Sequence, residues 1–182
     1  MKRRACQRGL SLVEAMTVVA VLGVLSAVAA PPLTGALDAA FRQGFANEAL
    51  TALSLARSEA IKRGDQVVFC KAQSAAACST EGNWGQGWLA FHDSNGNAQL
   101  DEHEPVVLRR EALPPGWRLS GNGPVANYVA YQSLGNARLV TGGFQAGTFT
   151  LCKESTRPTT AVRLVINSVG RPRTETVRVA SC

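Results

Sequence analysis

The sequence has few aromatic residues and lacks the short motifs that mark most enzymes. Aromatic residues make up 6% of the 182 residues, and histidine occurs only as His92 and His103. No phosphate-binding loop, H-E-x-x-H motif or G-x-S-x-G motif is present. Both histidines lie near acidic residues, but no nucleophile motif accompanies them. We therefore expect neither an enzyme nor a bound cofactor.

Most of the net positive charge lies in the first nine residues, and the rest of the chain is nearly neutral. The formal net charge is +6, but Lys2, Arg3, Arg4 and Arg8 all lie within the first nine residues. Without them, fifteen basic residues face thirteen acidic ones, a net charge of +2. From residue 138 onward, seven basic residues face two acidic ones. That region can attract a polyanion, although scattered charges more often form a solvated sheet face.

Cysteine is sparse, and its number suggests pairing. Cys6 belongs to the first nine residues, and Cys70, Cys78, Cys152 and Cys182 follow it. An even number downstream of an export-type segment predicts two disulfides in an oxidising compartment. Three pairings are possible, and we prefer Cys70 with Cys78 and Cys152 with Cys182, because local bridges need the least extra topology. A zinc site is the alternative, but neither a C-x-x-C motif nor a suitably spaced histidine supports a metal.

A long apolar run near the amino terminus, residues 10–30, contains one charged residue, Glu14. As a helix it would span roughly 30 Å, enough for a bilayer core, with its basic flank in the cytoplasm. A conventional signal peptide is one interpretation, because residues 27–29 resemble an A-x-A cleavage site. A plain membrane anchor is another. A leader cut after Gly9 is the third, and it explains the carboxylate best. An unpaired charge inside a span costs roughly 2.5–3.5 kcal/mol, whereas the new α-amino group of Leu10 can pair with it.

The stretch RGLSLVEAMTVVAVLGVLSAVAAPP resembles the class III signal and amino-terminal helix of type IV pilins and pseudopilins, with Gly9, Glu14 and Pro31 at the family positions. Leu10 stands where phenylalanine is usual. The resemblance implies that a prepilin peptidase cuts between Gly9 and Leu10 and methylates the amine of Leu10. It implies that Glu14 serves filament assembly with other pilins or pseudopilins. It also implies a single-pass protein of the inner membrane with its head in the periplasm.

Beyond Pro31 the sequence predicts more helix and then strands. Apolar residues recur at helical spacing at Leu37, Phe41, Phe45, Ala49, Leu53, Ala56 and Ala60. The helix is expected to end near Arg63, with Gly64 as its stop signal. Short period-two segments follow, including one over residues 137–141. We expect an α+β protein with a leader (1–9), a transmembrane or filament-core helix (10–30), an amphipathic continuation (31–64) and a β-rich globular head (65–182).

The whole chain resembles the GspH/FimT group of pseudopilins. The matching stretches are VVFCKAQSAAAC, GNWGQGWLAFHDSNGNAQLDEHEPVV, TFTLCKES and RLVINSVGRPRTE, with a terminal cysteine. The resemblance implies a long helix packed on a β-sandwich-like head, and a FimT-like minor pilin that is incorporated in a type IV pilus or primes it. A GspH-like minor pseudopilin of a type II secretion system is the alternative. A periplasmic binding domain behind a cleaved signal peptide is a third interpretation.

The stretch Gly170, Arg171, Pro172, Arg173 is predicted to form the turn between the last two strands. Glycine permits a tight bend there, and each guanidinium group can hold a phosphate bidentately. A G-R-x-R motif near the carboxy terminus resembles the one that carries DNA binding in FimT-type minor pilins of naturally competent bacteria. We hypothesise sequence-independent contacts of Gly170, Arg171 and Arg173 with double-stranded DNA in natural transformation. Lys153, Arg157, Arg163 and Arg178 could extend the patch, and the alternative is a pair of solvated loop arginines.

Two other stretches have both a structural and a functional interpretation. Oxygen-bearing side chains in residues 93–104 fall on the EF-hand offsets 1, 3, 5, 9 and 12. Ala98 stands where that motif needs glycine, and no helices flank the stretch, so we favour a polar hairpin loop over a calcium site. Trp84 and Trp88 are expected to lie in the core of the head. The alternative is that they are exposed and stack on bases.

Overall fold

The computed structural model describes residues 11–73 and 76–182, except for the side chains of residues 27–33. The chain forms two compact units, Met1–Ala40 and Phe41–Cys182, and we call the second unit the head. One helix, α1 (Leu12–Arg63), runs through both units. All the strands described below belong to the head. This arrangement confirms the predicted α+β class.

The predicted end of the long helix is confirmed. Gly64 follows Arg63 and has a φ of +67°, in the left-handed region that glycine tolerates. The N–H of Asp65 donates to the carbonyl of Ala60 at 3.2 Å, which closes the last turn as a Schellman motif. The Oδ2 of Asp65 lies 2.7 Å from Nε2 of His92. The hydrogen bond with His92 lowers the pKa of Asp65, so this pair ties the helix end to the sheet.

The face of α1 that enters the core of the head consists almost entirely of alanine. Its buried residues are Ala46, Ala49, Ala52, Leu53, Ala56 and Ala60. Such small side chains let strands approach the helix backbone closely. Phe45 is half-buried, with its ring edge-on to Trp117 at 5.7 Å between centroids. Leu37 and Phe41, at the start of the predicted apolar spacing, are 49% and 54% exposed, and the buried stretch of α1 begins at Ala46.

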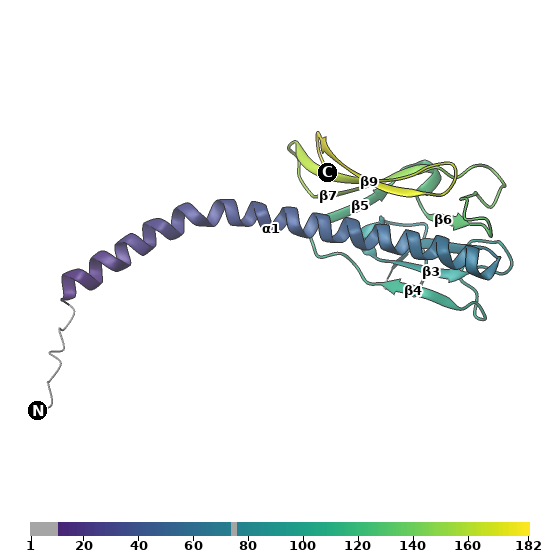
Figure 1. Cartoon of the computed structure of the whole chain (residues 1–182), viewed down its shortest axis with the longest axis horizontal. Helices are drawn as coiled ribbons and strands as arrows, with labels where there is room; N and C mark the ends of the chain where they lie inside the picture. Colours follow the sequence, from purple (N-terminus) through teal and green to yellow (C-terminus); the bar gives the residue numbers. More distant parts are fainter. Residues whose placement is uncertain (1–10, 74–75) are drawn as a thin grey trace, which may run out of the picture. The chain divides into compact units, whose positions relative to one another are not determined.

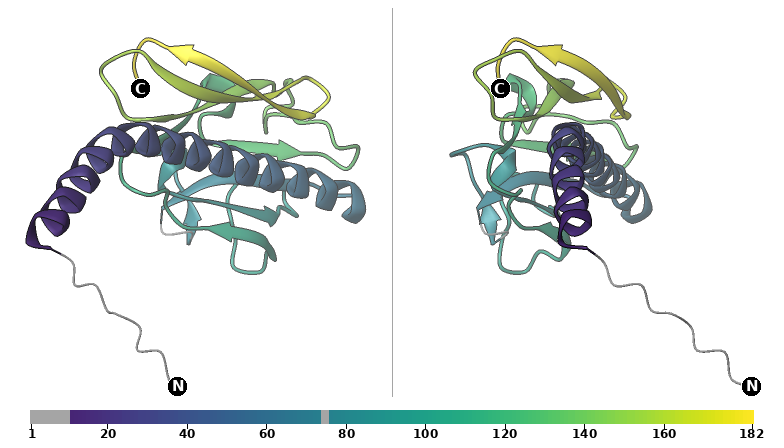
Figure 2. Two further views of the ribbon diagram at one scale, coloured as in Figure 1. Left: turned by 60° about the vertical axis from the view of Figure 1, so that its left-hand side comes forward. Right: turned by 90° about the vertical axis from the view of Figure 1, so that its left-hand side faces the viewer.

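Two antiparallel sheets make up the rest of the head. The first sheet has the order β2-β1-β3-β4, with β6 also paired to β1. The second sheet has the order β5-β7-β8-β9. Their bounds are β1 (Val67–Gln73), β2 (Ala77–Cys78), β3 (Trp88–His92), β4 (Val106–Arg110), β5 (Trp117–Gly121), β6 (Tyr128–Tyr131), β7 (Gly147–Lys153), β8 (Thr159–Ile166) and β9 (Pro172–Val179). Figures 1 and 2 show β3 and β4 of the first sheet on one side of the last part of α1 and the second sheet on the other.

Residues 137–141 do not form the strand predicted for them. They contribute only to isolated bridges, Tyr131 with Ala137 and Arg138 with Phe144. The buried side chain of Gln145 makes hydrogen bonds to the backbone of β6 in place of the missing strand. Its Oε1 accepts the N–H of Ala130 at 2.8 Å, and its Nε2 donates to the carbonyl of Tyr128 at 2.8 Å. A buried side-chain amide whose donors and acceptor are all hydrogen-bonded can hold an irregular segment in place without the backbone hydrogen bonds of a β-strand.

Trp84 and Trp88 lie in the core, as expected, with 0% and 1% of their surfaces exposed. The indole N–H of Trp84 donates to the carbonyl of Val125 at 3.0 Å. Its ring stacks on Phe69 and meets Phe149 edge-on, both at 5.0 Å between centroids. Buried rings of this kind cannot stack on bases, so that alternative is excluded.

Both preferred disulfides are present. Cys70 bonds to Cys78 across 8 residues, and Cys152 bonds to Cys182 across 30 residues. The first joins β1 to β2, and the second holds the carboxy terminus to β7. The N–H of Cys182 also donates to the carbonyl of Ser155 at 2.8 Å.

Membrane crossing is not indicated by the described helix. No helix in residues 11–73 and 76–182 is both long and apolar enough to pass through a bilayer. The transmembrane helix predicted for residues 10–30 lies partly outside the described residues and stays a prediction.

The two disulfides should differ in their effect on stability. Loop-closure entropy predicts that Cys152→Ala with Cys182→Ala lowers the free energy of unfolding by about 3–4 kcal/mol, and Cys70→Ala with Cys78→Ala by about 2–3 kcal/mol. Urea unfolding of the full chain in micelles, followed by tryptophan fluorescence, measures both losses. An equal or reversed order would contradict the loop-closure explanation.

Candidate functional site

Glu14 lies in the first turn of α1 and is exposed. Gly9 and Leu10, the predicted cleavage and methylation positions, lie outside the described residues. Ser11 precedes the helix, and its Oγ accepts the N–H of Glu14 at 3.2 Å, which makes it the N-cap. An acidic residue at this position also meets the positive end of the helix dipole. The S-x-x-E spacing is an established N-cap signal that our sequence analysis missed.

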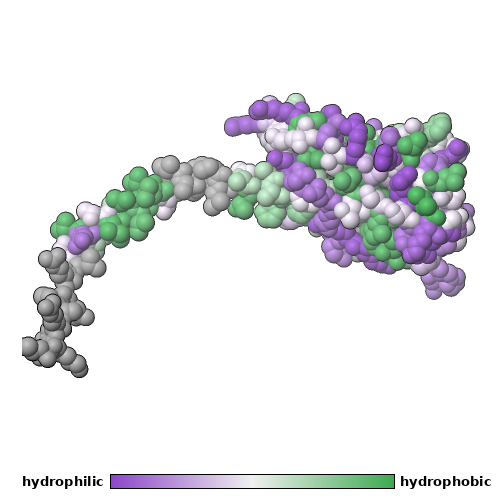
Figure 3. All heavy atoms as spheres, in the orientation of Figure 1, coloured by the Kyte–Doolittle hydropathy of each residue, from purple (hydrophilic) through white to green (hydrophobic). Residues whose placement is uncertain are grey.

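Apolar side chains surround the first part of α1. Nine of them are between 53% and 78% exposed: Leu12, Val13, Met16, Val18, Val19, Val21, Leu22, Val24 and Leu25. Figure 3 shows this part of the helix in the green of hydrophobic residues. Contiguous apolar surface of this kind marks an interaction site in most proteins.

The turn between β8 and β9 is built around Gly170, as predicted. The N–H of Gly170 donates to the carbonyl of Asn167 at 2.9 Å, and the N–H of Arg171 donates to Oδ1 of Asn167 at 2.8 Å. Gly170 has a φ of +77°. A Cβ at this position would lie 2.3 Å from the carbonyl oxygen of Gly135. Conformation and close approach therefore both require glycine.

A hydrogen bond from α1 supports the turn, and no pattern in the sequence predicts it. The carbonyl oxygen of Gly135, against which Gly170 packs, accepts a hydrogen bond from Nε of Arg57 at 2.7 Å. Arg57 lies on α1, so one guanidinium group links the helix to the loop that supports the turn. The two residues are 78 positions apart, and only the folded chain brings them together.

Arg171 and Arg173 are both exposed at this turn, but their surroundings differ. Nη1 of Arg173 lies 2.9 Å from Oε2 of Glu175, an ion pair at the surface. Within the described part of the chain, the side chain of Arg171 has no hydrogen bond or ion pair. Arg171 is therefore available to a ligand directly, whereas the charge of Arg173 is partly neutralised by its carboxylate partner.

The strand register decides which other arginines share a face with Arg173. Arg163 lies opposite Glu175 in the β8–β9 ladder, and Val165 lies opposite Arg173. Successive strand residues alternate between faces, so Arg163, Arg173 and Glu175 lie on the outer face of the second sheet. Arg178, which could extend the patch, lies opposite Thr160 at the other parity, so it is on the other face of β9 from Arg173.

The loop of residues 93–104 is closed by its own hydrogen bonds. Asp93 is 1% exposed, and its carboxylate accepts the N–H groups of Gly96 at 2.8 Å and Ala98 at 2.9 Å. Glu104 accepts the N–H of Ser94 at 2.7 Å. Among the described residues, no group of three or more acidic, histidine or cysteine side chains could hold a metal ion. These contacts fit the polar loop that we favoured.

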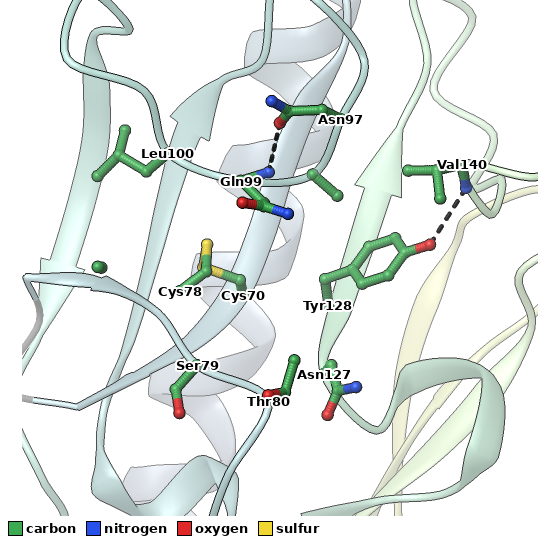
Figure 4. Close-up of a pocket in the computed structure, with 12 residues that line it drawn as sticks. Cys70, Cys78, Ser79, Thr80, Asn97, Gln99, Leu100, Asn127, Tyr128 and Val140 are labelled. Carbon is green, nitrogen blue, oxygen red and sulfur yellow. Dashed lines mark hydrogen bonds between the residues drawn. A yellow bond between two sulfur atoms is a disulfide. The ribbon is translucent and has the colours of Figure 1, made fainter.

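A pocket of about 390 Å³ lies beside the Cys70–Cys78 disulfide (Figure 4). Cys70 belongs to the buried cluster on the face of the first sheet that does not meet α1. The walls come from β2, the loop of residues 93–104, the start of β6 and Val140. Since these segments are distant in sequence, spacing alone could not reveal the pocket.

Comparison with known proteins gives two family matches. The family described as type II transport protein GspH matches residues 46–170, and the prokaryotic N-terminal methylation motif matches residues 4–30. No curated protein matches the chain in a sequence search.

Among solved structures, the chain is similar to the type IV minor pilin FimU of Pseudomonas aeruginosa strain PAO1 in two crystal forms. The TM-scores are 0.57 and 0.56, with 18% sequence identity in both. The similarity covers 78% and 77% of this chain, and 94% and 98% of the respective FimU chains. At this identity the likeness establishes the fold alone.

Substitution of Gly170 should separate backbone strain from close contact. Gly116 also has a positive φ, +83°, but a Cβ there meets open space, so it is a matched control. We expect Gly116→Ala to cost about 1–2 kcal/mol and Gly170→Ala about 1–3 kcal/mol more, measured by urea unfolding. Equal losses would show that the contact with Gly135 does not constrain the turn.

Proposed function

The chain belongs to the GspH family of type II transport proteins, and we propose that it is a minor pilin, built into a type IV pilus or priming one. The observation that carries the proposal is the exposed apolar surface of α1 with Glu14 in its first turn. Water does not favour such a surface, whereas the equivalent surfaces of neighbouring subunits would bury it.

Glu14 would fix the axial position of each subunit relative to its neighbours in the filament. A carboxylate that is buried among apolar helices without a partner is strongly unfavourable. Cleavage between Gly9 and Leu10 by a prepilin peptidase would create an α-amino group four residues before Glu14. That amine, on the same chain or on a neighbour, can pair with the carboxylate and make one axial position better than others. The match of the methylation motif to residues 4–30 supports this processing.

The location follows from the same proposal. Before assembly, the amino-terminal segment would hold the subunit in the inner membrane with the head in the periplasm. An oxidising periplasm suits the two disulfides of the head. Other pilins or pseudopilins would then replace lipid around α1.

DNA binding is the finer part of the proposal. Exposed Arg171, with Arg173 and Arg163 along the outer face of the second sheet, would hold phosphates of double-stranded DNA without reading its sequence. The rigid turn around Gly170 supports this, because it limits the conformational freedom that the arginines would lose on binding. In this proposal the subunit would serve DNA uptake in natural transformation.

The second candidate is a minor pseudopilin of a type II secretion system. The description of the matching family favours it directly. The assembly device in α1 would be the same in both systems, whereas the arginines would have no nucleic-acid ligand. DNA binding is therefore the property that separates the two candidates.

Processing can be tested by mass spectrometry of the protein purified from cells with the prepilin peptidase. We expect a mature chain that begins at Leu10 and carries one added methyl group on its amine. The same chain from cells without the peptidase should retain residues 1–9. A mature chain that begins near residue 30 would overturn the filament proposal.

Phosphate contacts can be tested by gel retardation of double-stranded DNA with the full chain in micelles. We expect Arg171→Ala with Arg173→Ala to abolish retardation at low salt, because affinity depends on the number of phosphates contacted. Glu175→Gln should strengthen binding, since it releases Arg173 from its ion pair. Arg42→Ala with Lys62→Ala removes the same charge from α1, away from the second sheet, and is the matched control. Retardation that is unchanged in the first variant, or equally lost in the control, would reject the DNA site.

A further inference from the structure

We propose that the pocket beside the Cys70–Cys78 disulfide binds a neutral sugar unit of a glycan. This inference goes beyond the filament and DNA proposals and depends on neither, because the pocket uses none of their residues. It rests on the size of the pocket, on the placement of its polar and apolar groups, and on its charge.

The size of the pocket is suitable for a small ligand. Its volume of about 390 Å³ falls within the range of roughly 300–1,000 Å³ that is typical of small-molecule sites. Three of its walls are fixed by covalent or hydrogen bonds. The disulfide fixes β2, and the buried carboxylate of Asp93 holds the loop that carries Ala98. Tyr128 accepts the N–H of Val140 at 3.1 Å through its hydroxyl oxygen.

The pocket has an apolar middle between two polar sides (Figure 4). The disulfide, the Tyr128 ring and Leu100 provide the apolar part. Side chains with hydroxyl or amide groups form the two sides: Ser79, Thr80 and Asn127 on one, and Asn97 and Gln99 on the other. A pyranose ring has the complementary arrangement, with C–H groups on its faces and hydroxyl groups around its edge. Amides suit these hydroxyls because each amide offers both donors and an acceptor.

Two of these amides are available to a ligand. Within the described part of the chain, no hydrogen bond occupies the side-chain amide of Gln99 or of Asn127. They belong to opposite sides of the pocket. A ligand with hydroxyl groups on opposite edges could bond to both at once.

The charge of the pocket decides between neutral and anionic ligands. Its lining contains no lysine, arginine, aspartate or glutamate among the described residues. An anion that entered it would lose hydration without gaining a counter-charge, which is unfavourable. The pocket therefore favours a neutral sugar over an acidic sugar or a nucleic-acid phosphate.

The proposal can be tested by NMR titration of the ¹⁵N-labelled full chain in a micelle whose detergent carries no sugar. The probes are cellobiose, maltose and N,N′-diacetylchitobiose, each to about 50 mM, so that even a Kd of a few millimolar would give saturation. We expect saturable shifts for at least one probe at residues of the pocket. Glucuronic acid, which is anionic, should produce much weaker shifts.

Two variants test the residues. Gln99→Ala with Asn127→Ala should weaken the binding at least about tenfold, as expected for two lost hydrogen bonds. Asn47→Ala removes an exposed amide from α1, outside the pocket, and should leave the affinity unchanged. Absence of saturable shifts with all three probes, shifts that map elsewhere, or undiminished affinity in the double variant would overturn the proposal. The spectrum of each variant without sugar shows whether it is folded.

Discussion

The close approach of two sheets to the alanine face of α1 is the constraint on which the head depends. Ala46, Ala49, Ala56 and Ala60 add little thickness to the helix, so residues of both sheets reach the same buried cluster. A larger residue on this face would push the strands away from the helix. It would thereby disturb other core contacts, such as the stacking of Trp84 on Phe69. The turn at Gly170 is set by the same geometry, because Arg57 on the helix supports the loop beneath it.

The elements that the sequence predicts well are those with local signals. Gly64 ends α1 because a left-handed glycine closes a helix wherever it occurs, and alternating residues such as Val162 and Leu164 identify β8. The preferred cysteine pairs followed from proximity in the chain. The segment near residues 137–141 could not be predicted, because its order comes from Gln145, a polar residue whose burial depends on tertiary contacts. The pocket and the Arg57 contact could not be predicted for the same reason.

The candidate sites occupy different parts of the chain and would bind their partners through different kinds of interaction. The first part of α1 offers apolar surface and one carboxylate. The second sheet offers guanidinium groups, of which Arg173 is held by Glu175. The first sheet offers an uncharged hollow beside Cys78. Such separation means that one surface can change in sequence without altering the others, provided that the alanine face of the helix is kept.

The bond between Cys152 and Cys182 also imposes an order of events on folding. Cys182 follows β9, and among the described strands β9 pairs with β8 alone. The disulfide can lock the second sheet only once β9 has paired with β8 and the two thiols have been oxidised. Until then, the edge of β8 is open to strands from other molecules, which is a known route to aggregation.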